Sequence, residues 1–408
     1  MTQTPRAVVL GLTAMLGAGV FAGFAPAAGL AGWWFVPALL LSALAALCSA
    51  FSTAEQSHAL PDAGGGYGYI RTQLGPWPAR LGAAAYLLGR FAMAAAIATT
   101  FGRYVVPDHP VAASVGLVAF TALLLAAGFH WTTGLSWGAV FFVLAALAVV
   151  VVSCFSIAPP QAVTTSGNPN ELVGVAGLMF VAFLGFERIT APLAGEPVHS
   201  PRVLRVAIPV TIVGSLAIYL TVGAAVHRQL GTDRLSLSGA PLHDALIAAD
   251  AYALMPVLQA GAAVAGLSSM YFVLAGTRRT MTAMVEHGDL PTSLSRAPRS
   301  VDVLAAAAVL VTVLLMPFTV ALGVAACAML FYYAFTNASA RILLQDERTW
   351  PMRTACFGLG ISVLLAMSVP VPALLTTIVG LGVGTGLFGL IARAAKPSVR
   401  TGPTLRAT

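Results

Sequence analysis

The residues best able to do chemistry form a glycine-rich stretch inside an apolar segment near the N-terminus. The stretch is Gly17-Ala18-Gly19-Val20-Phe21, within an apolar run over about residues 7–30. Each glycine lowers helix propensity by about 1 kcal/mol relative to alanine, so the pattern predicts two half-helices joined by unwound backbone. The free N–H groups at such a joint favour a carboxylate, and its free carbonyls favour an ammonium group. The stretch therefore predicts a site for a zwitterion.

The composition indicates the surroundings of this joint. The chain has 408 residues, of which 58% are hydrophobic and only 9% are charged. A soluble domain of this size cannot bury so much apolar surface, so we expect an all-α polytopic membrane protein in contact with the lipid bilayer. Unwound backbone at bilayer depth is tolerated only where it is buried in protein or lines a cavity, which agrees with a binding site.

Hydropathy predicts about twelve membrane-spanning helices. The expected spans are 7–29, 33–53, 79–102, 111–129, 135–157, 172–193, 205–226, 254–276, 301–317, 319–339, 354–369 and 371–392. Between spans, residues 61–74 are expected to lie along the cytoplasmic surface, and residues 238–253 to form a short outer lid.

The basic residues predict the orientation. With the N-terminus inside, all but four of the 21 Lys and Arg residues fall in cytoplasmic segments. The exceptions are Arg103, Arg228 and Arg234 in outer loops and Arg90 within a span. The positive-inside rule therefore places both termini in the cytoplasm, in a plasma membrane protein. The net charge of +7 is explained in this way, without nucleic acid as a partner.

The cysteines give no sign of a metal site or a disulfide framework. Cys48, Cys154, Cys327 and Cys356 are far apart, lie in or beside apolar spans and show no CxxC spacing. We interpret them as small membrane-buried residues.

Four motifs, taken in order, resemble signatures of the amino acid-polyamine-organocation transporter superfamily. They are Gly17-Ala18-Gly19-Val20-Phe21 in the first span; Ala54-Glu55, Pro61, Gly65-Gly66-Tyr67 and Leu74-Gly75-Pro76 after the second; Phe183-Leu184-Gly185-Phe186-Glu187 and Gly195-Glu196-Pro197 in and after the sixth; and Thr277-Arg278-Arg279 and Gly288-Asp289-Leu290-Pro291 after the eighth. Each motif alone is weakly specific, but the four together in this order are strong. The resemblance covers about residues 7–340.

This resemblance implies a transporter core over residues 1–340, built as an inverted repeat of five plus five helices around a midplane site. Spans one to five would occupy residues 7–157 and spans six to ten residues 172–339, with spans one and six broken. Residues 341–394 would add two C-terminal helices, and residues 395–408 would form a short cytoplasmic tail.

The resemblance also implies a substrate site at the two breaks. Backbone N–H groups around Gly17, Ala18 and Gly19 would hold a carboxylate, and the Met15 carbonyl would take the ammonium. The matching carbonyls of the sixth span would be those of Val181 and Leu184. Two aromatic residues, Phe180 and Phe183, are candidates for a gate over the substrate, and the alternative is that they only pack against lipid or a neighbouring helix.

Two charged residues lie in or near spans, where charge is costly unless it is paired or hydrated. Two roles are open for Glu187: proton acceptance during coupling, or a structural cap paired with Arg188 or Arg202. For Arg90 the alternatives are an ion pair with Glu55 or Glu187, or snorkelling to the cytoplasmic interface, which we expect over a pair.

The coupling ion stays open at this point. Ser268 and Ser269 lie where sodium-coupled relatives place a hydroxyl ligand, but serines more often bond to their own helix backbone. The fifth span, 135–157, carries no charge and so lacks the lysine that proton-coupled relatives often use. No cofactor is expected beyond a proton or sodium gradient.

These features predict a secondary transporter for amino acids or related amines that works by alternating access. The alternative is a polyamine or cationic amino acid exchanger, which would need more acidic residues in the spans than this chain offers, so we expect neutral amino acids. An enzyme or a channel is disfavoured, because the seven histidines are scattered and no repeated polar filter is present. Monomer and homodimer are both left open.

Overall fold

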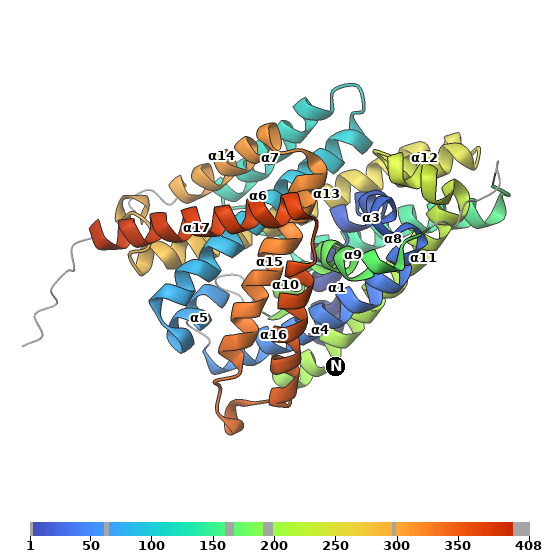
Figure 1. Ribbon diagram of the computed structural model, residues 1–408. Coiled ribbons are helices and arrows are strands. Elements are labelled where there is room, and N and C mark those ends of the chain that lie inside the picture. Colours follow the sequence, from blue (N-terminus) through green and yellow to red (C-terminus); the bar gives the residue numbers. More distant parts are fainter. Residues whose placement is uncertain (1–2, 61–64, 160–166, 191–198, 296–298, 395–408) are drawn as a thin grey trace, which may run out of the picture.

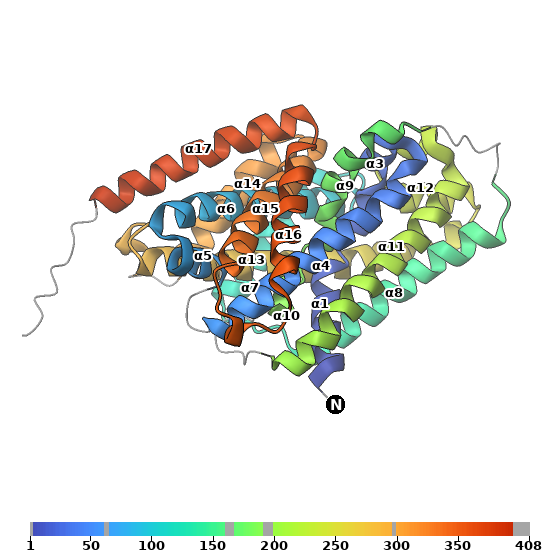
Figure 2. The same cartoon turned by 60° about the horizontal axis from the view of Figure 1, so that its bottom comes forward.

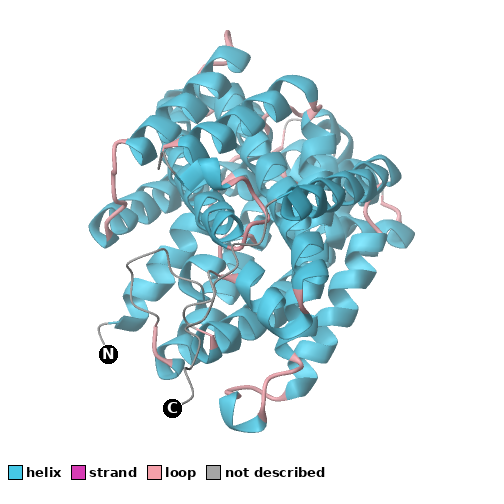
Figure 3. Ribbon diagram, turned by 90° about the vertical axis from the view of Figure 1, so that its left-hand side faces the viewer, coloured by secondary structure: helices cyan, strands magenta, loops and turns pink. Residues whose placement is uncertain are grey.

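The computed structural model describes residues 3–60, 65–159, 167–190, 199–295 and 299–394, and this part of the chain is helical without strands (Figures 1 and 3). The helices are α1 (Gln3–Met15), α2 (Ala18–Ala22), α3 (Phe24–Ala31), α4 (Phe35–Ala59), α5 (Gly66–Leu74), α6 (Pro76–Val105), α7 (Pro110–Ala126), α8 (Thr133–Ser156), α9 (Leu172–Met179), α10 (Glu187–Thr190), α11 (Pro201–Leu237), α12 (Pro241–Ala248), α13 (Met255–Glu286), α14 (Ser300–Leu315), α15 (Phe318–Ala340), α16 (Met352–Met367) and α17 (Val371–Ala394). Six short 3₁₀ turns accompany them: η1 (Gly32–Trp34), η2 (Pro169–Glu171), η3 (Phe180–Phe183), η4 (Tyr252–Leu254), η5 (Thr292–Ser295) and η6 (Gln345–Glu347).

The all-α membrane fold expected from hydropathy is confirmed. Each of the twelve expected spans contains helix in the described residues, and seven helical stretches there are long and apolar enough to cross a membrane. Four further apolar helices are shorter, 110–126, 169–183, 300–315 and 352–367. The number of crossings and the inverted repeat stay predictions, and residues 395–408 lie outside the described residues.

Helix α6 runs through the centre of the bundle. It begins with prolines in its first turn, where their missing N–H groups cost nothing, and its apolar stretch is 83% buried. Around it pack α5, α7, α13, α14, α15 and α17 (Figure 1). Alanine and glycine dominate its buried face, which allows close approach between helices that have no hydrophobic driving force in lipid.

The two ends of α6 mark the two ends of the bundle. Near its start, the Arg80 side chain bonds to Asp289 beside α5, and near its end, the Tyr104 hydroxyl accepts a hydrogen bond from the Leu242 backbone in α12. Helices α5 and α12 accordingly lie at opposite ends in two views (Figures 1 and 2). Helix α5 corresponds to the segment expected on the cytoplasmic surface, whose first part, 61–64, lies outside the described residues, and α12 corresponds to the expected outer lid.

Two helices extend well beyond their expected spans. Helix α11 covers Pro201–Leu237 and is interrupted at Gly231, which has φ 72° and ψ 172°, and α13 continues to Glu286. A span predicted from hydropathy ends at the first charged residues, whereas the backbone hydrogen bonds of a helix can continue into polar surroundings. The ends of these helices were therefore underestimated from the sequence.

Candidate binding site at two helix breaks

The first break separates α1 from α2. Helix α1 ends at Met15, and Gly17 has φ −120° and ψ −137°, outside the helical region. Ala18 and Gly19 then open α2, so their N–H groups lie in a first turn, where no acceptor exists within the helix. The unwound joint expected in the first span is present, with N–H groups available to an anion.

The second break lies in the sixth span. Helix α9 passes into the 3₁₀ turn η3, a non-helical turn covers residues 184–186, and α10 follows. Gly185 has φ +124°, a conformation that side-chain-bearing residues rarely adopt. A Cβ atom there would lie 2.7 Å from the carbonyl carbon and oxygen of Ala14 in α1. The second break therefore packs directly on the end of the first half-helix.

Two glycines of the first break make equally close contacts. A Cβ atom on Gly19 would lie 2.4 Å from Cα of Ala182, and one on Gly17 would lie 2.4 Å from Oγ of Ser269 in α13. Such distances leave no room for a methyl group without backbone movement. The glycines thus let both breaks and α13 meet at one place.

Tyr219 of α11 connects the carbonyl groups of the two breaks. Its phenolic oxygen lies 2.9 Å from the Met15 carbonyl oxygen and 2.7 Å from that of Ala182, so its single proton can serve either acceptor. The side chain is fully buried, and its ring lies edge-on to Phe183. Polar backbone atoms of both broken spans therefore converge on one buried hydroxyl.

Tyr219 was not predicted from the sequence, and the carbonyls predicted for the sixth span were those of Val181 and Leu184. The Val181 carbonyl accepts a local hydrogen bond from the Leu184 N–H group at 3.3 Å, while the Ala182 carbonyl faces Tyr219. The sequence does contain a signal that points to this residue, a tyrosine within an apolar span, because a buried tyrosine hydroxyl normally needs a hydrogen-bond partner.

The two aromatic gate candidates pack inside the protein in this conformation. Phe180 and Phe183 are both fully buried. Phe180 lies edge-on to Tyr333, with ring centroids 5.7 Å apart, and Phe183 lies edge-on to Tyr219 at 5.3 Å. Neither lines the cavity described below, and their gate role stays a prediction.

A cavity of about 50 Å³ lies beside the second break. Leu184, Gly185 and Glu187 line it from the sixth span, Ser269 lines it from α13, and Arg90 lines it from α6. A space of this size holds a few water molecules, since each needs about 10–15 Å³ of such volume.

The charged pair in this cavity corrects one expectation. Arg90 does not snorkel: it is 5% exposed, and its Nη2 lies 2.5 Å from Oε2 of Glu187. The Tyr333 hydroxyl donates to the other carboxylate oxygen, and the guanidinium lies over the Tyr86 ring at 4.9 Å. Packing of the third span against the sixth gives both charges a partner inside the bundle, which snorkelling would not have provided for Glu187.

The other partners considered for these charges are occupied differently. The Glu55 carboxylate accepts hydrogen bonds from the backbone N–H groups of Thr349 and Trp350, at 3.1 and 2.7 Å. Arg188 lies over the Phe272 ring. The motif at residues 195–197 lies outside the described residues.

The two serines of α13 differ in their surroundings. Ser268 donates to the Ala265 carbonyl of its own helix at 3.2 Å, and its hydroxyl also lies 3.5 Å from the Thr13 carbonyl of α1. Ser269 is 1% exposed, lines the cavity, and its hydroxyl has no partner among the described residues. Three oxygens, from Thr13, Ala265 and Ser268, thus lie close together beside the first break.

Comparison with known proteins decides the family. A family model described as amino acid permease matches residues 3–394, almost the whole chain. The chain belongs to the amino acid permease family. Relatives of this permease include uncharacterized transporters of Mycobacterium bovis and of two Mycobacterium tuberculosis strains. Each is 35% identical over an aligned region of 395 residues that covers 94% of this chain and 89% of the relative.

The family assignment confirms the resemblance to the amino acid-polyamine-organocation superfamily. This permease is a multi-pass membrane transporter, as its composition and its motifs predicted. The family assignment gives no support to the alternative hypothesis of a membrane enzyme.

Proposed function

We propose that this permease is a secondary active transporter that carries amino acids by alternating access. The substrate would bind where the break between α1 and α2 meets the break between η3 and α10. The observation that carries the proposal is the contact of the Tyr219 hydroxyl with the carbonyls of Met15 and Ala182. A substrate ammonium can replace that hydroxyl as the donor, while its carboxylate takes the N–H groups that open α2.

We propose neutral amino acids as the substrate class. Glu187 is the one carboxylate among the described residues that line the cavity, and it is already bonded to Arg90 and Tyr333. A second positive charge on the substrate would need an acidic partner that is not already engaged. This argues against the polyamine or cationic amino acid exchanger.

For coupling, the arrangement supports sodium at Ser268 over proton transfer at Glu187. The Glu187 carboxylate is already bonded to Arg90 and Tyr333, which gives it a structural role in the bundle. The oxygens of Thr13, Ala265 and Ser268 are the kind of neutral ligands that suit a hard cation. We further propose a plasma membrane location with both termini in the cytoplasm, following the distribution of arginines.

The direct test measures the thermal stability of purified permease against a panel of amino acids and polyamines, with and without sodium, at acidic and neutral pH. A ligand that binds only the folded state stabilises it by about 2.7 kcal/mol at one hundred times its Kd. We expect the melting temperature to rise with neutral amino acids, and more so with sodium.

The same panel is then tested for uptake into liposomes. Stabilisation and uptake confined to polyamines or arginine would support the exchanger instead. Absence of binding, accumulation and exchange across the whole panel would overturn the proposal.

A further inference from the structure

The start of α5 forms part of the wall of the central cavity. Gly65 and Gly66 both line it. A Cβ atom on Gly66 would fall 1.7 Å from the Tyr332 hydroxyl oxygen of α15, and one on Gly65 would lie 3.5 Å from the guanidinium carbon of Arg279 in α13. The backbone at the start of α5 therefore lies directly against side chains from two helices of the bundle.

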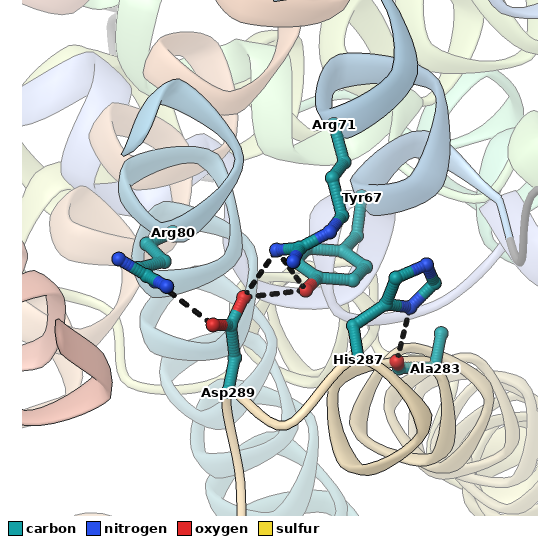
Figure 4. Close-up of polar contacts among 6 residues, drawn as sticks. All are labelled: Tyr67, Arg71, Arg80, Ala283, His287 and Asp289. Atoms are coloured by element: carbon teal, nitrogen blue, oxygen red, sulfur yellow. Dashed lines mark hydrogen bonds and ion pairs between the residues drawn. The ribbon is translucent and has the colours of Figure 1, made fainter. Parts of the chain in front are cut away.

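One side chain outside the cavity fastens this helix. The Asp289 carboxylate, which is 0% exposed, follows the end of α13. Its Oδ2 accepts hydrogen bonds from the Tyr67 hydroxyl at 2.5 Å and from Arg71 at 2.8 Å, both on α5 (Figure 4). Its Oδ1 accepts a hydrogen bond from Nε of Arg80, on the first turns of α6, at 2.8 Å. A single carboxylate thus joins α5, α6 and the end of α13.

The surroundings of Asp289 keep this junction in one geometry. Gly288, with φ +75°, makes a tight turn, and the Asp289 N–H donates to the Met284 carbonyl at 2.9 Å. Burial and the neighbouring Asp289 carboxylate raise the pKa of Tyr67, so its hydroxyl remains a donor at physiological pH. Every partner of the carboxylate is therefore a donor, and two of them are cationic.

The connection between α5 and α6 is suited to movement. A single residue, Gly75, separates Leu74 from Pro76, with φ +93° and ψ 178°, and a Cβ atom there would meet nothing within 4 Å. Hinges are formed by a few residues at element ends that absorb a change in backbone angles. Rotation at Gly75 would carry the start of α5 away from Tyr332.

We propose that α5 is the lid of the transport pathway at this end of the bundle, and that Asp289 is the positioning residue that holds the lid closed. The inference rests on the alternating-access function proposed above, in which this end is cytoplasmic. Release of substrate to this side requires Gly65 and Gly66 to leave Tyr332 and Arg279. Because Tyr67 and Arg71 belong to the lid whereas Arg80 belongs to α6, the strength of the Asp289 contacts sets how often the lid opens.

The test uses a cysteine reporter inside the cavity. Thr53 of α4 lines the cavity and is 2% exposed, so Thr53→Cys, in a variant whose four native cysteines are replaced, reacts with a membrane-impermeant maleimide only when the cavity opens. The labelling rate is measured from each side of oriented vesicles without substrate. Asp289→Asn keeps the shape but removes the charge, and we expect labelling from the α5 side to become about tenfold faster.

The matched control is Asp302→Asn. Asp302 of α14 is also buried, at 4% exposure, and it pairs with Arg278 of α13. Neither residue belongs to the lid. We expect this variant to label within about twofold of the parent. Equal rates for Asp289→Asn and Asp302→Asn would overturn the proposal, and so would acceleration only from the α12 side.

A second pair of variants covers a failure of Asp289→Asn to fold. Arg71→Gln and Tyr67→Phe each remove one lid contact, Arg71 being a partly exposed residue, and each must accelerate labelling from the α5 side. Unchanged labelling in both would equally overturn the proposal. Because no substrate is present, faster labelling together with a negative uptake panel would retain the lid and reject the amino acid assignment.

Discussion

The phenolic oxygen of Tyr219 lies 2.9 Å from the carbonyl oxygen of Met15, the residue at which the first half-helix ends. In Tyr219→Phe, this carbonyl loses one donor but keeps the Gly17 N–H, whereas the Ala182 carbonyl loses the tyrosine hydroxyl, and a buried group left unsatisfied costs about 1–3 kcal/mol. We expect a lower melting temperature without ligand. Because no tyrosine hydroxyl then competes with a substrate ammonium for these two carbonyls, we also expect the ligand to raise the melting temperature more than it does in the parent.

Tyr104→Phe is the control for this prediction. The Tyr104 hydroxyl also donates to a buried carbonyl, that of Phe21 at 2.6 Å, but it lies at the α12 end of α6. This variant should lose stability without a larger ligand response. An equal ligand response in the two variants would remove Tyr219 from the site.

Gly19→Ala should weaken binding strongly without unfolding the permease. The added methyl group would meet the Ala182 backbone at 2.4 Å, so the two breaks must separate, with a cost of about 1–3 kcal/mol for overpacking. We expect at least a tenfold loss of affinity in the thermal assay, which corresponds to about 1.4 kcal/mol. Gly214→Ala in α11, where a Cβ atom meets nothing within 4 Å, should bind as the parent does. Retained affinity in Gly19→Ala would contradict the assignment.

Arg90→Leu and Glu187→Leu should each destabilise the permease strongly. Each single change leaves one buried charge unpaired, which costs about 3–5 kcal/mol in comparable pairs. The double variant removes both charges and should regain much of the lost stability, a coupling that a double-mutant cycle measures directly. Additive losses would indicate that the two side chains act independently.

Ser268→Ala should raise the sodium concentration needed for half-maximal uptake by about tenfold, because a ligand to the cation is lost. Thr277→Val on the same helix is the control, since the Thr277 hydroxyl donates to the Val273 carbonyl of its own helix at 2.8 Å. Sodium-independent uptake by the parent permease would exclude this site and return the question to the proton.

The spans could be predicted from the sequence because each is a local run of apolar residues, and the bilayer imposes a similar length on all of them. The breaks were also locally encoded, by the glycines at 17, 19 and 185. The side-chain partners were not, because they join helices far apart in the chain. Arg90 and Glu187 are separated by 97 residues, Met15 and Tyr219 by 204, and Tyr67 and Asp289 by 222. Such pairs depend on how the helices pack, which hydropathy does not report.

Helix α6 carries a fastening residue at each end, Arg80 toward α5 and Tyr104 toward α12, within one uninterrupted helix of 30 residues. Each residue in an α-helix advances the chain by about 1.5 Å along the helix axis and turns it by about 100° about that axis. Insertion or deletion of a single residue between Arg80 and Tyr104 would therefore rotate one of these two side chains away from its hydrogen-bond partner. The length of this helix between Arg80 and Tyr104 is therefore expected to be invariant among functional variants of the permease.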